Sequence, residues 1–231
     1  MSVFFKRRGQ VPKFPKKASD YAIGSSVILP INGTLREFII VNKGRPSSLY
    51  DSSCNGIWLL MKDIYETRVW NSPYNDYENS SIHAYLNNDF LNLFDSNVKS
   101  AIKQVKIPYN YGYGNSGVVK SGSNGLSTKV FLLSAIEVGW NASSFAYMSV
   151  DGSKLSYFGS SMTDAKRAAS YNGTNTNWWT RSPYTYDTFY VYCVDPNGSH
   201  TQQMVSNSNG VRPALILDST AEFDPDTNII L

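Results

Sequence analysis

The side chains that could carry covalent or acid–base chemistry are few and widely spaced in this chain of 231 residues. Histidine occurs only as His83 and His200, and cysteine only as Cys54 and Cys193. A nucleophilic site needs a histidine oriented beside a serine or cysteine, and no nucleophile motif accompanies either histidine. The chain also has no Cys/His cluster with the spacing of a metal site. We therefore expect a protein that is not an enzyme and that uses no metal and no cofactor.

Three weaker patterns point to other chemistry. Asp187 and Asp195 could be the carboxylate pair of a carbohydrate-active enzyme, but nothing else in the sequence supports catalysis. The run 224–228 resembles the start of a calcium loop, yet it lacks the glycine and the distal glutamate of such a loop, so we interpret it as a solvated tail. The glycine-rich run 112–117 does not lie between a parallel strand and a helix, which makes it a poor indication of phosphate binding.

The composition of one segment favours molecular recognition. Between Tyr171 and Arg212 the chain holds eight aromatic and only four charged residues in forty-two positions, among many Ser, Thr, Asn and Gly. Antibody combining sites have this composition, because tyrosine provides rigid contact area while Ser and Asn provide adaptable hydrogen bonds. A Tyr-rich sheet that covers a core would have a similar composition. We interpret segment 171–213 as a surface that displays side chains to a ligand.

Charge separates a short N-terminal arm, residues 1–17, from the domain formed by residues 18–231. The arm holds six of the 21 basic residues and no acidic one, so the domain carries 15 basic against 18 acidic groups. The aromatic segment is nearly neutral and lacks the electrostatic attraction on which nucleic-acid binding depends, so we expect no nucleic-acid partner. With Val3, Phe4 and Phe5 at its start, the arm is expected to dock onto a virion or onto another copy of the protein.

Hydropathy places the chain outside the membrane. No apolar run approaches the roughly 20 residues of a membrane span, and the basic start is not followed by the apolar segment of a secretory signal. We expect no membrane span, and a location in the bacterial cytoplasm before assembly into a virion. Two cysteines are too few for a disulfide framework, although a single bridge remains open.

Hydrophobic patterning predicts an α+β fold with small antiparallel sheets, a few helices and a large fraction of loop. Segments 22–29 and 35–41 flank an Asn-Gly turn and are expected to form a hairpin. Further strands are expected at 56–62, 130–134, 156–158, 178–181, 189–194, 200–205 and 211–217.

Helical spacing predicts two short helices between residues 80 and 94, capped by Ser80 or Ser81 and broken at 87–89. Another helix, capped by Asp95 or Ser96, is expected to end before Pro108 and to present one apolar face made of Val98, Ala101, Ile102 and Val105. A short helix is expected near 163–169, and long loops at 109–129 and 141–170.

Two motifs near the C-terminal end carry a family resemblance. The run Trp-Trp-Thr-Arg-Ser-Pro at 178–183 is followed by Gly-Val-Arg-Pro-Ala at 210–214. The chain therefore resembles a family of gut-bacterial and phage proteins whose domains end in a W-x-R-S-P … V-R-P-A signature and whose function is unassigned. The likeness extends from about residue 18 to residue 217, through the runs 56–60, 79–86, 90–94 and 129–134.

The resemblance implies a C-type-lectin-like fold that requires no calcium. In related phage and bacterial proteins, diversity-generating retroelements rewrite codons near the C-terminus, and the fold displays the altered side chains to a ligand. Adenine-directed changes at Asn codons yield Tyr, Asp, Ser, Thr, His, Phe and Cys, whereas Gln202, Gln203 and Met204 are not single-step products. The variable ligand-binding face expected from this resemblance consists of Tyr184, Tyr186, Asp187, Phe189, Tyr190, Tyr192, Cys193, Asp195, Ser199, His200, Thr201, Ser206 and Asn207.

Other residues of the segment are expected to form a framework behind that face. The two arginines are expected to be buried and to hold loop carbonyls or a carboxylate, since a guanidinium presents a rigid fork of donors. Val191 and Val194 are expected to belong to a buried layer. The framework comprises Trp178, Trp179, Arg181, Gly210 and Arg212.

These observations predict a non-enzymatic recognition protein, a variable protein of a phage or prophage that binds a bacterial surface protein or glycan. Two alternatives remain. One is a structural virion or cell-surface subunit whose Tyr-rich face is permanently buried against a partner. The other is a carbohydrate-active enzyme.

Overall fold

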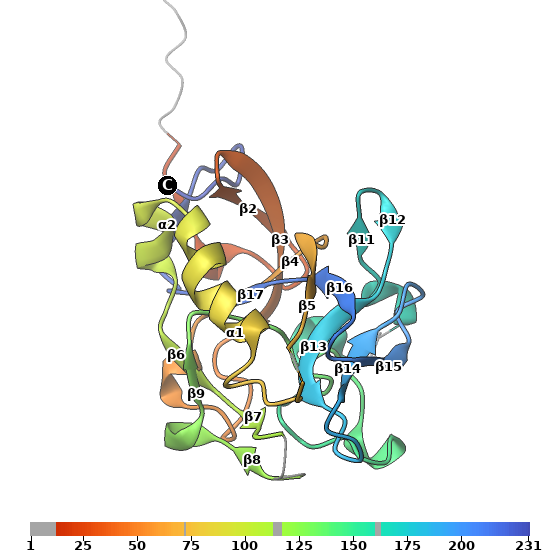
Figure 1. Cartoon of the computed structure of the whole chain (residues 1–231). Helices are drawn as coiled ribbons and strands as arrows, with labels where there is room; N and C mark the ends of the chain where they lie inside the picture. The colour runs from red at the N-terminus through yellow and green to blue at the C-terminus, as the bar shows by residue number, and fades with distance from the viewer. Residues whose placement is uncertain (1–12, 72, 113–116, 160–162) are drawn as a thin grey trace, which may run out of the picture.

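The two largest sheets of the protein each have five strands, as a computed structural model of residues 13–71, 73–112, 117–159 and 163–231 shows (Figure 1). The first sheet has the strand order β10 (Val130–Phe131), β17 (Ala214–Leu217), β4 (Ile57–Met61), β3 (Thr34–Lys43) and β2 (Ser26–Ile31). The second has the order β15 (His200–Met204), β14 (Tyr190–Val194), β13 (Trp178–Pro183), β16 (Ser208–Val211) and β5 (Glu66–Val69). β13 and β16 pair in parallel, and the other neighbours in both sheets are antiparallel.

Smaller elements surround the two sheets. Two short helices, α1 (Ser81–Tyr85) and α2 (Ser96–Ala101), lie on the side of the molecule away from β14 and β15 (Figure 1). The remaining strands form two-stranded pairs: β1 (Lys16–Lys17) with β18 (Glu222–Phe223), β6 (Val105–Ile107) with β9 (Leu126–Thr128), β7 (Tyr109–Asn110) with β8 (Val119–Lys120), and β11 (Ser170–Tyr171) with β12 (Thr174–Asn175). The mixed fold of small, mostly antiparallel sheets with few helices is confirmed. In the part of the chain described, no helix is long and apolar enough to cross a membrane.

Local sequence signals are confirmed where they are strongest. Asn32 and Gly33 have positive φ angles of 48° and 71°, which the two-residue turn between β2 and β3 requires. Every residue of β4 is buried, as its uninterrupted apolar run predicts. Ser80 caps α1, and its Oγ accepts a hydrogen bond from the backbone N–H of His83 at 3.2 Å.

Several predicted elements were wrong. The helical chain is not broken at 87–89 but continues from α1 through a π-helical turn, because the Asn87 side chain accepts hydrogen bonds from the backbone N–H groups of Lys129 and Val130. Val105 lies in β6 instead of on a helix, and the expected loop 109–129 contains β7, β8 and β9. Residues 156–158 form a 3₁₀-helix instead of a strand, and the helix near 163–169 is a single 3₁₀ turn (Asp164–Lys166).

The C-terminal run expected to be a solvated tail instead packs on the first sheet. Phe223 and Ile230 are buried, and the backbone N–H of Ile28 donates to the carbonyl of Asn228 at 2.8 Å. The Asp224 carboxylate accepts backbone N–H groups of its own turn, so it stabilises a turn rather than a calcium loop. The end of the N-terminal arm pairs as β1 with β18. Its apolar start, Val3, Phe4 and Phe5, and the centre of the glycine-rich run, 113–116, lie outside the described residues.

The expected strand 211–217 is divided between the two sheets, because the chain crosses from β16 to β17 at Arg212 and Pro213. The segment from β4 to β5 crosses at the same place, since β4 pairs with β17 and β5 with β16. The buried Arg212 donates from Nε to the carbonyl of Met61 (2.8 Å) and from Nη2 to that of Lys62 (2.9 Å). Burial lowers the pKa of Arg212 to about 10, so the group is still charged at neutral pH. One guanidinium thus holds both crossings together.

Arg181 of β13 forms a second buried centre. Its guanidinium makes a double contact with the Glu137 carboxylate at 2.6 and 2.7 Å. Its other hydrogen bonds go to the carbonyls of Pro108, Leu132 and Asp151 at 3.1, 2.9 and 3.0 Å, so all five N–H donors have partners. This residue therefore ties β13 to three loops.

Asp151 lies beside this pair and is fully buried. Its Oδ2 accepts a hydrogen bond from the Ser182 hydroxyl at 2.7 Å, whereas its Oδ1 has no partner. Burial raises the pKa of Asp151 to about 6, even though the Arg181 charge acts in the opposite direction. Ionisation of the Asp151 carboxyl group therefore destabilises the folded protein.

Replacing Arg181 with methionine is expected to leave the Glu137 carboxylate buried without its cation. The free energy of unfolding should fall by about 3–5 kcal/mol, the usual cost of an uncompensated buried charge. Urea denaturation followed by circular dichroism measures it. Lys62→Met, which breaks the exposed pair with Glu37, is the control and should cost no more than about 1 kcal/mol. Equal losses in the two variants would contradict a structural role for Arg181.

Asp151→Asn is expected to stabilise the protein at high pH and to have little effect at low pH. The pKa of Asp151 is about 6 in the folded protein and about 3.9 in the unfolded chain. The proton on Asp151 therefore stabilises the folded protein fully below pH 4, and this stabilisation is lost as the pH rises through 6. The loss amounts to about 3 kcal/mol, and Asn, which mimics the protonated acid, avoids it.

Denaturation curves of Asp151→Asn and the parent protein at intervals from pH 4 to pH 8 test the direction of this pH dependence. Asp218→Asn is the opposite control, because hydrogen bonds from Thr220 lower the pKa of Asp218 and its contribution is lost on acidification. Parallel stability curves for the parent and Asp151→Asn would show that Asp151 does not titrate in this range.

Candidate functional site

The loop between β13 and β14 takes its shape from Asn75, a side chain more than a hundred residues away in sequence. The Asn75 amide Nδ2 donates to the carbonyls of Tyr184, Asp187 and Tyr190 at 3.3, 3.1 and 2.9 Å. The backbone N–H of Asn75 also donates to the carbonyl of Thr188 at 2.8 Å. Asn75 itself is buried. The loop 184–190 is therefore built around a fixed internal template.

A second loop places Tyr147 against this one. Tyr147 has a positive φ of 67°, a conformation that costs a bulky residue about 1–3 kcal/mol and persists only where its surroundings enforce it. Thr185 does so by donating from its backbone N–H and its hydroxyl to the Tyr147 carbonyl, at 3.1 and 2.9 Å. The Tyr147 ring lies 5.7 Å from that of Tyr184 and 4.9 Å from that of Tyr186. The result is a pre-assembled cluster of rings.

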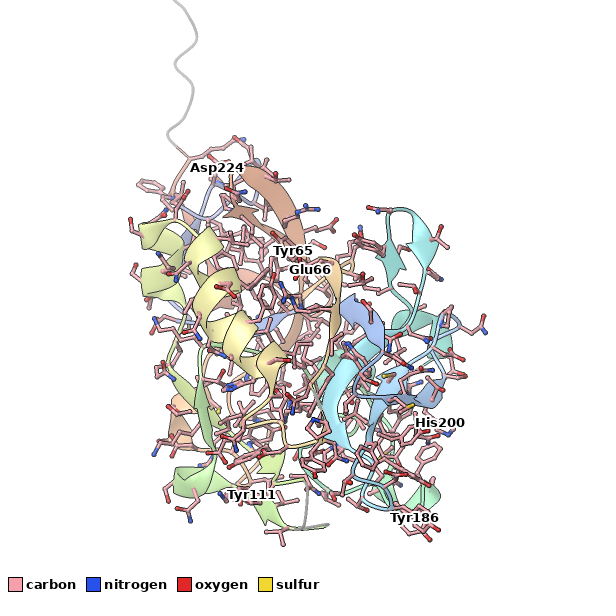
Figure 2. All side chains as sticks on the ribbon, viewed as in Figure 1. Tyr65, Glu66, Tyr111, Tyr186, His200 and Asp224 are labelled. Atoms are coloured by element: carbon pink, nitrogen blue, oxygen red, sulfur yellow. The ribbon has the colours of Figure 1, made fainter. Side chains whose placement is uncertain are left out.

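We use the name aromatic face for the rings of Tyr147, Tyr184 and Tyr186 together with Phe189 of the same loop, whose ring lies 5.9 Å from that of Tyr74. Tyr186 is 70 % exposed, Tyr147 49 % and Phe189 43 %, while Tyr184 is half-buried beneath them. Figure 2 shows Tyr186 at one end of the molecule, on the same side as His200 and at the opposite end from Asp224. Exposed aromatic rings held in fixed positions are typical of recognition surfaces.

A cavity of about 210 Å³ opens beside the aromatic face. Asn75 Oδ1 has no hydrogen-bond partner, although Nδ2 of the same amide has three. Gly112 approaches the backbone of Asn75 so closely that a Cβ on residue 112 would lie 2.5 Å from the backbone carbonyl oxygen of Asn75. The φ of +74° at Gly112 also favours glycine. The described side chains around the cavity are uncharged and include those of Asn75, Asn110, Pro183, Tyr184, Tyr186 and Thr188.

Most residues of the expected variable face are at least partly exposed. Tyr184, Tyr186, Asp187, Phe189 and Tyr190 share the loop 184–190, which the structure brings together with Tyr147. The others lie at the two ends of β15 and along it: Asp195, Ser199, His200, Thr201, Ser206 and Asn207. Asp187 and Asp195 each accept a backbone N–H of their own turn, so they shape loops rather than project freely.

Two members of that face were placed wrongly. Tyr192 and Cys193 are buried, because β14 is an interior strand whose residues from Val191 to Val194 are covered on both sides. The Tyr192 hydroxyl donates to the carbonyl of Ala146 at 3.0 Å, and its ring lies 5.7 Å from that of Tyr184. Tyr192 therefore supports the aromatic face from below and cannot contact a ligand from solvent.

His200 begins the edge strand β15 and stacks on a different loop. Its ring centroid lies 4.2 Å from that of Phe145 and 6.0 Å from that of Trp140. Phe145 belongs to the same loop as Tyr147, so this loop runs from the edge of the second sheet to the aromatic face. No sequence pattern indicates this role, since residues 141–150 have neither strand nor helix periodicity.

The five framework residues are all buried. The indole N–H groups of Trp178 and Trp179 donate to the carbonyls of Arg167 and Arg68 at 2.9 and 2.8 Å. Gly210 lies where a Cβ would come within 2.7 Å of Ile64 and 2.9 Å of the Asn177 carbonyl, so only glycine fits this contact.

Asn75 and Asn110, which border the cavity, were missed because no local pattern distinguishes them from other loop asparagines.

The potential catalytic side chains are not arranged for the reactions considered. Burial raises the pKa of Cys54 to about 12 and that of Cys193 well above its ordinary value, and both are free thiols. Burial lowers the pKa of His83, which lies in α1. Asp187 and Asp195 flank β14, whose length of about 14 Å exceeds the separation of about 5–10 Å in glycosidases. Among the described residues, no group of three or more His, Cys, Asp or Glu could hold a metal ion.

Comparison with known proteins identifies a family but no activity. Residues 55–219 match the model of the family described as Domain of unknown function (DUF6273). This span covers over two thirds of the chain and contains Asn75, the aromatic face, Arg181 and Arg212. No match was found among the curated proteins or the solved structures. The chain belongs to the DUF6273 family, a domain of unknown function.

Proposed function

We propose that this protein is a non-enzymatic recognition module whose aromatic face binds a molecule on a bacterial surface. The observation that carries the proposal is the exposure of Tyr147, Tyr186 and Phe189 on two loops whose conformations are held from within. Aromatic side chains dominate binding hot spots because each provides a large contact area at a small cost in conformational entropy. Single exposed apolar residues are common on protein surfaces, whereas a contiguous exposed apolar patch often marks an interaction site.

The internal supports favour binding without rearrangement. Asn75 holds three carbonyls of the loop 184–190, and Thr185 holds Tyr147 in its positive-φ conformation. Ordering a flexible interface costs about 0.5–1.5 kcal/mol for each immobilised side chain. A pre-assembled face has met this cost during folding, so more of the contact energy is available for affinity.

The finer parts of the proposal rest on the sequence resemblance. We propose a C-type-lectin-like fold, a phage or prophage variable protein, and diversification of the exposed positions by a retroelement. The N-terminal arm would dock the protein to a virion or to another copy of itself. The burial of Tyr192 and Cys193 limits diversification to the positions that reach solvent.

Replacing Tyr186 and Phe189 together with alanine is expected to weaken binding to bacterial cells at least about tenfold, since exposed hot-spot aromatics contribute about 2 kcal/mol or more. Fluorescently labelled full-length protein, titrated onto intact cells from a panel of gut bacterial isolates, measures the loss by flow cytometry. Leu35→Ala is the matched control, because this apolar side chain is 57 % exposed and lies in β3, outside the loop 184–190.

Thermal unfolding and light scattering separate the alternatives for the same variants. A large drop in melting temperature of the double variant would show that these rings belong to the core. If the parent protein forms an oligomer that the double variant cannot form, the face is a permanent subunit contact. Unchanged cell binding by a folded, monomeric double variant would rule out recognition through this face.

Codon-by-codon sequencing of the locus in its source population is expected to show substitutions concentrated at exposed positions such as Tyr186, Phe189 and His200. Tyr192, Cys193 and the framework arginines should stay constant, because substitutions there would disrupt buried packing or leave a buried charge unpaired. A flat substitution profile would remove the proposed diversification and leave a fixed binding surface.

A further inference from the structure

We infer that the cavity beside the aromatic face is a subsite for one uncharged sugar residue, such as the terminal residue of a surface glycan. The inference rests on the proposed function and assigns a ligand class to part of the same face. It follows from three properties of the cavity: its neutral lining, its rigid polar wall and its size beside tyrosine rings.

The lining disfavours charged ligands. The described residues around the cavity are Asn, Gly, Pro, Tyr and Thr, without Arg, Lys, Asp or Glu among them. Asp187 is close in sequence, but its carboxylate accepts the backbone N–H of Phe189 within its own turn at 2.9 Å. Phosphate or carboxylate groups are usually bound by arginine or by clusters of donors, and burying an unpaired charge is costly. The cavity is suited to a neutral polar molecule.

The two asparagine amides form a fixed polar wall of the cavity. Because Asn75 Nδ2 donates to three backbone carbonyls, a flipped amide would place oxygen against oxygen, which fixes Oδ1 as the atom without a partner. A buried acceptor without a partner costs about 1–3 kcal/mol. The neighbouring Asn110 is already satisfied, since its Nδ2 contacts Ser149 Oγ and its Oδ1 accepts the N–H of Gly112. Both amides are therefore held in place by the protein, which makes this wall of the cavity polar and rigid.

The dimensions and the aromatic rings fit a single sugar ring. The cavity, at about 210 Å³, exceeds the roughly 150 Å³ of a protein cavity that holds benzene, so a single six-membered ring fits it. Tyr184, Tyr186 and Pro183 provide apolar surface for the C–H face of the ring, while Thr185 and Thr188 add hydroxyl groups at the rim. A polyhydroxylated ring presents an apolar face to the aromatic rings and hydroxyl groups to the polar wall, whereas an aliphatic side chain has no polar group for that wall.

Nuclear magnetic resonance of ¹⁵N-labelled full-length protein tests the assignment. The probes are the methyl glycosides of glucose, galactose and N-acetylglucosamine, with N-acetylneuraminic acid as the charged comparison. We expect at least one neutral glycoside to shift the side-chain amide of Asn75 and the backbone amides of Thr185 and Thr188, with a millimolar dissociation constant. The charged sugar should leave these signals unchanged.

Two variants locate the binding. Thr188→Val preserves the shape of the side chain and removes its hydroxyl, so the affinity for the active glycoside should fall about three- to tenfold. Tyr186→Ala removes an apolar wall and should abolish detectable shifts at Asn75. Thr174→Val, on the exposed strand β12, is the matched control and should bind like the parent.

The results separate this inference from the proposed function. If none of the neutral glycosides shifts the cavity signals while Tyr186→Ala/Phe189→Ala still loses cell binding, the face recognises a protein and the sugar subsite is refuted. Glycoside shifts confined to the larger cavity lined by Tyr65 and Tyr171 would refute it as well. If the cavity binds a glycoside but the double variant binds cells normally, the sugar subsite stands and recognition through the aromatic face is refuted.

Discussion

The architecture depends on how backbone carbonyls are satisfied where the chain crosses between the two sheets. Strands β4 and β16 end at this place, so the carbonyls of Met61, which is buried, and Lys62, which is more exposed, leave the regular ladder. A buried carbonyl without a donor is costly, and Arg212 supplies donors to both. Backbone bonds from Met61 to Pro213 and from Tyr65 to Val211 complete the crossing. The second sheet, and with it the loop 184–190, is thereby set relative to the first.

Arg181 serves the same purpose nearer to the aromatic face. It gathers carbonyls from three loops and neutralises Glu137, and the adjoining Asp151 holds Ser182 just before the loop 184–190 begins. Support and display are therefore carried by different residues: buried arginines, tryptophans and Asn75 determine the backbone, and exposed rings contact the solvent. A surface built in this way tolerates substitution at its exposed positions, because their side chains contribute little to the core.

Local signals predicted those elements whose determinants are close in sequence. The Asn-Gly turn, the fully apolar β4 and the Ser80 cap each depend on a few neighbouring residues, and all three are confirmed. The failures have a common cause in distant contacts. The segment 211–217 is apolar except for Arg212, yet it divides between two sheets because Arg212 binds Met61 and Lys62, which are 151 and 150 positions away. Asn87 likewise changes the form of a helix by binding a strand that is 43 residues distant.

For the candidate site, the sequence by itself determined the types of side chain available: many tyrosines, few charges, and two arginines in a polar segment. It could not determine which of these residues face solvent, because period-2 alternation loses its meaning in a strand that is covered on both sides. Tyr192 and Tyr186 look alike in the sequence, but one is beneath the aromatic face and the other is its most exposed member. Tertiary structure alone brought in Tyr147, Asn75 and the cavity, since these depend on contacts between loops that no local preference encodes.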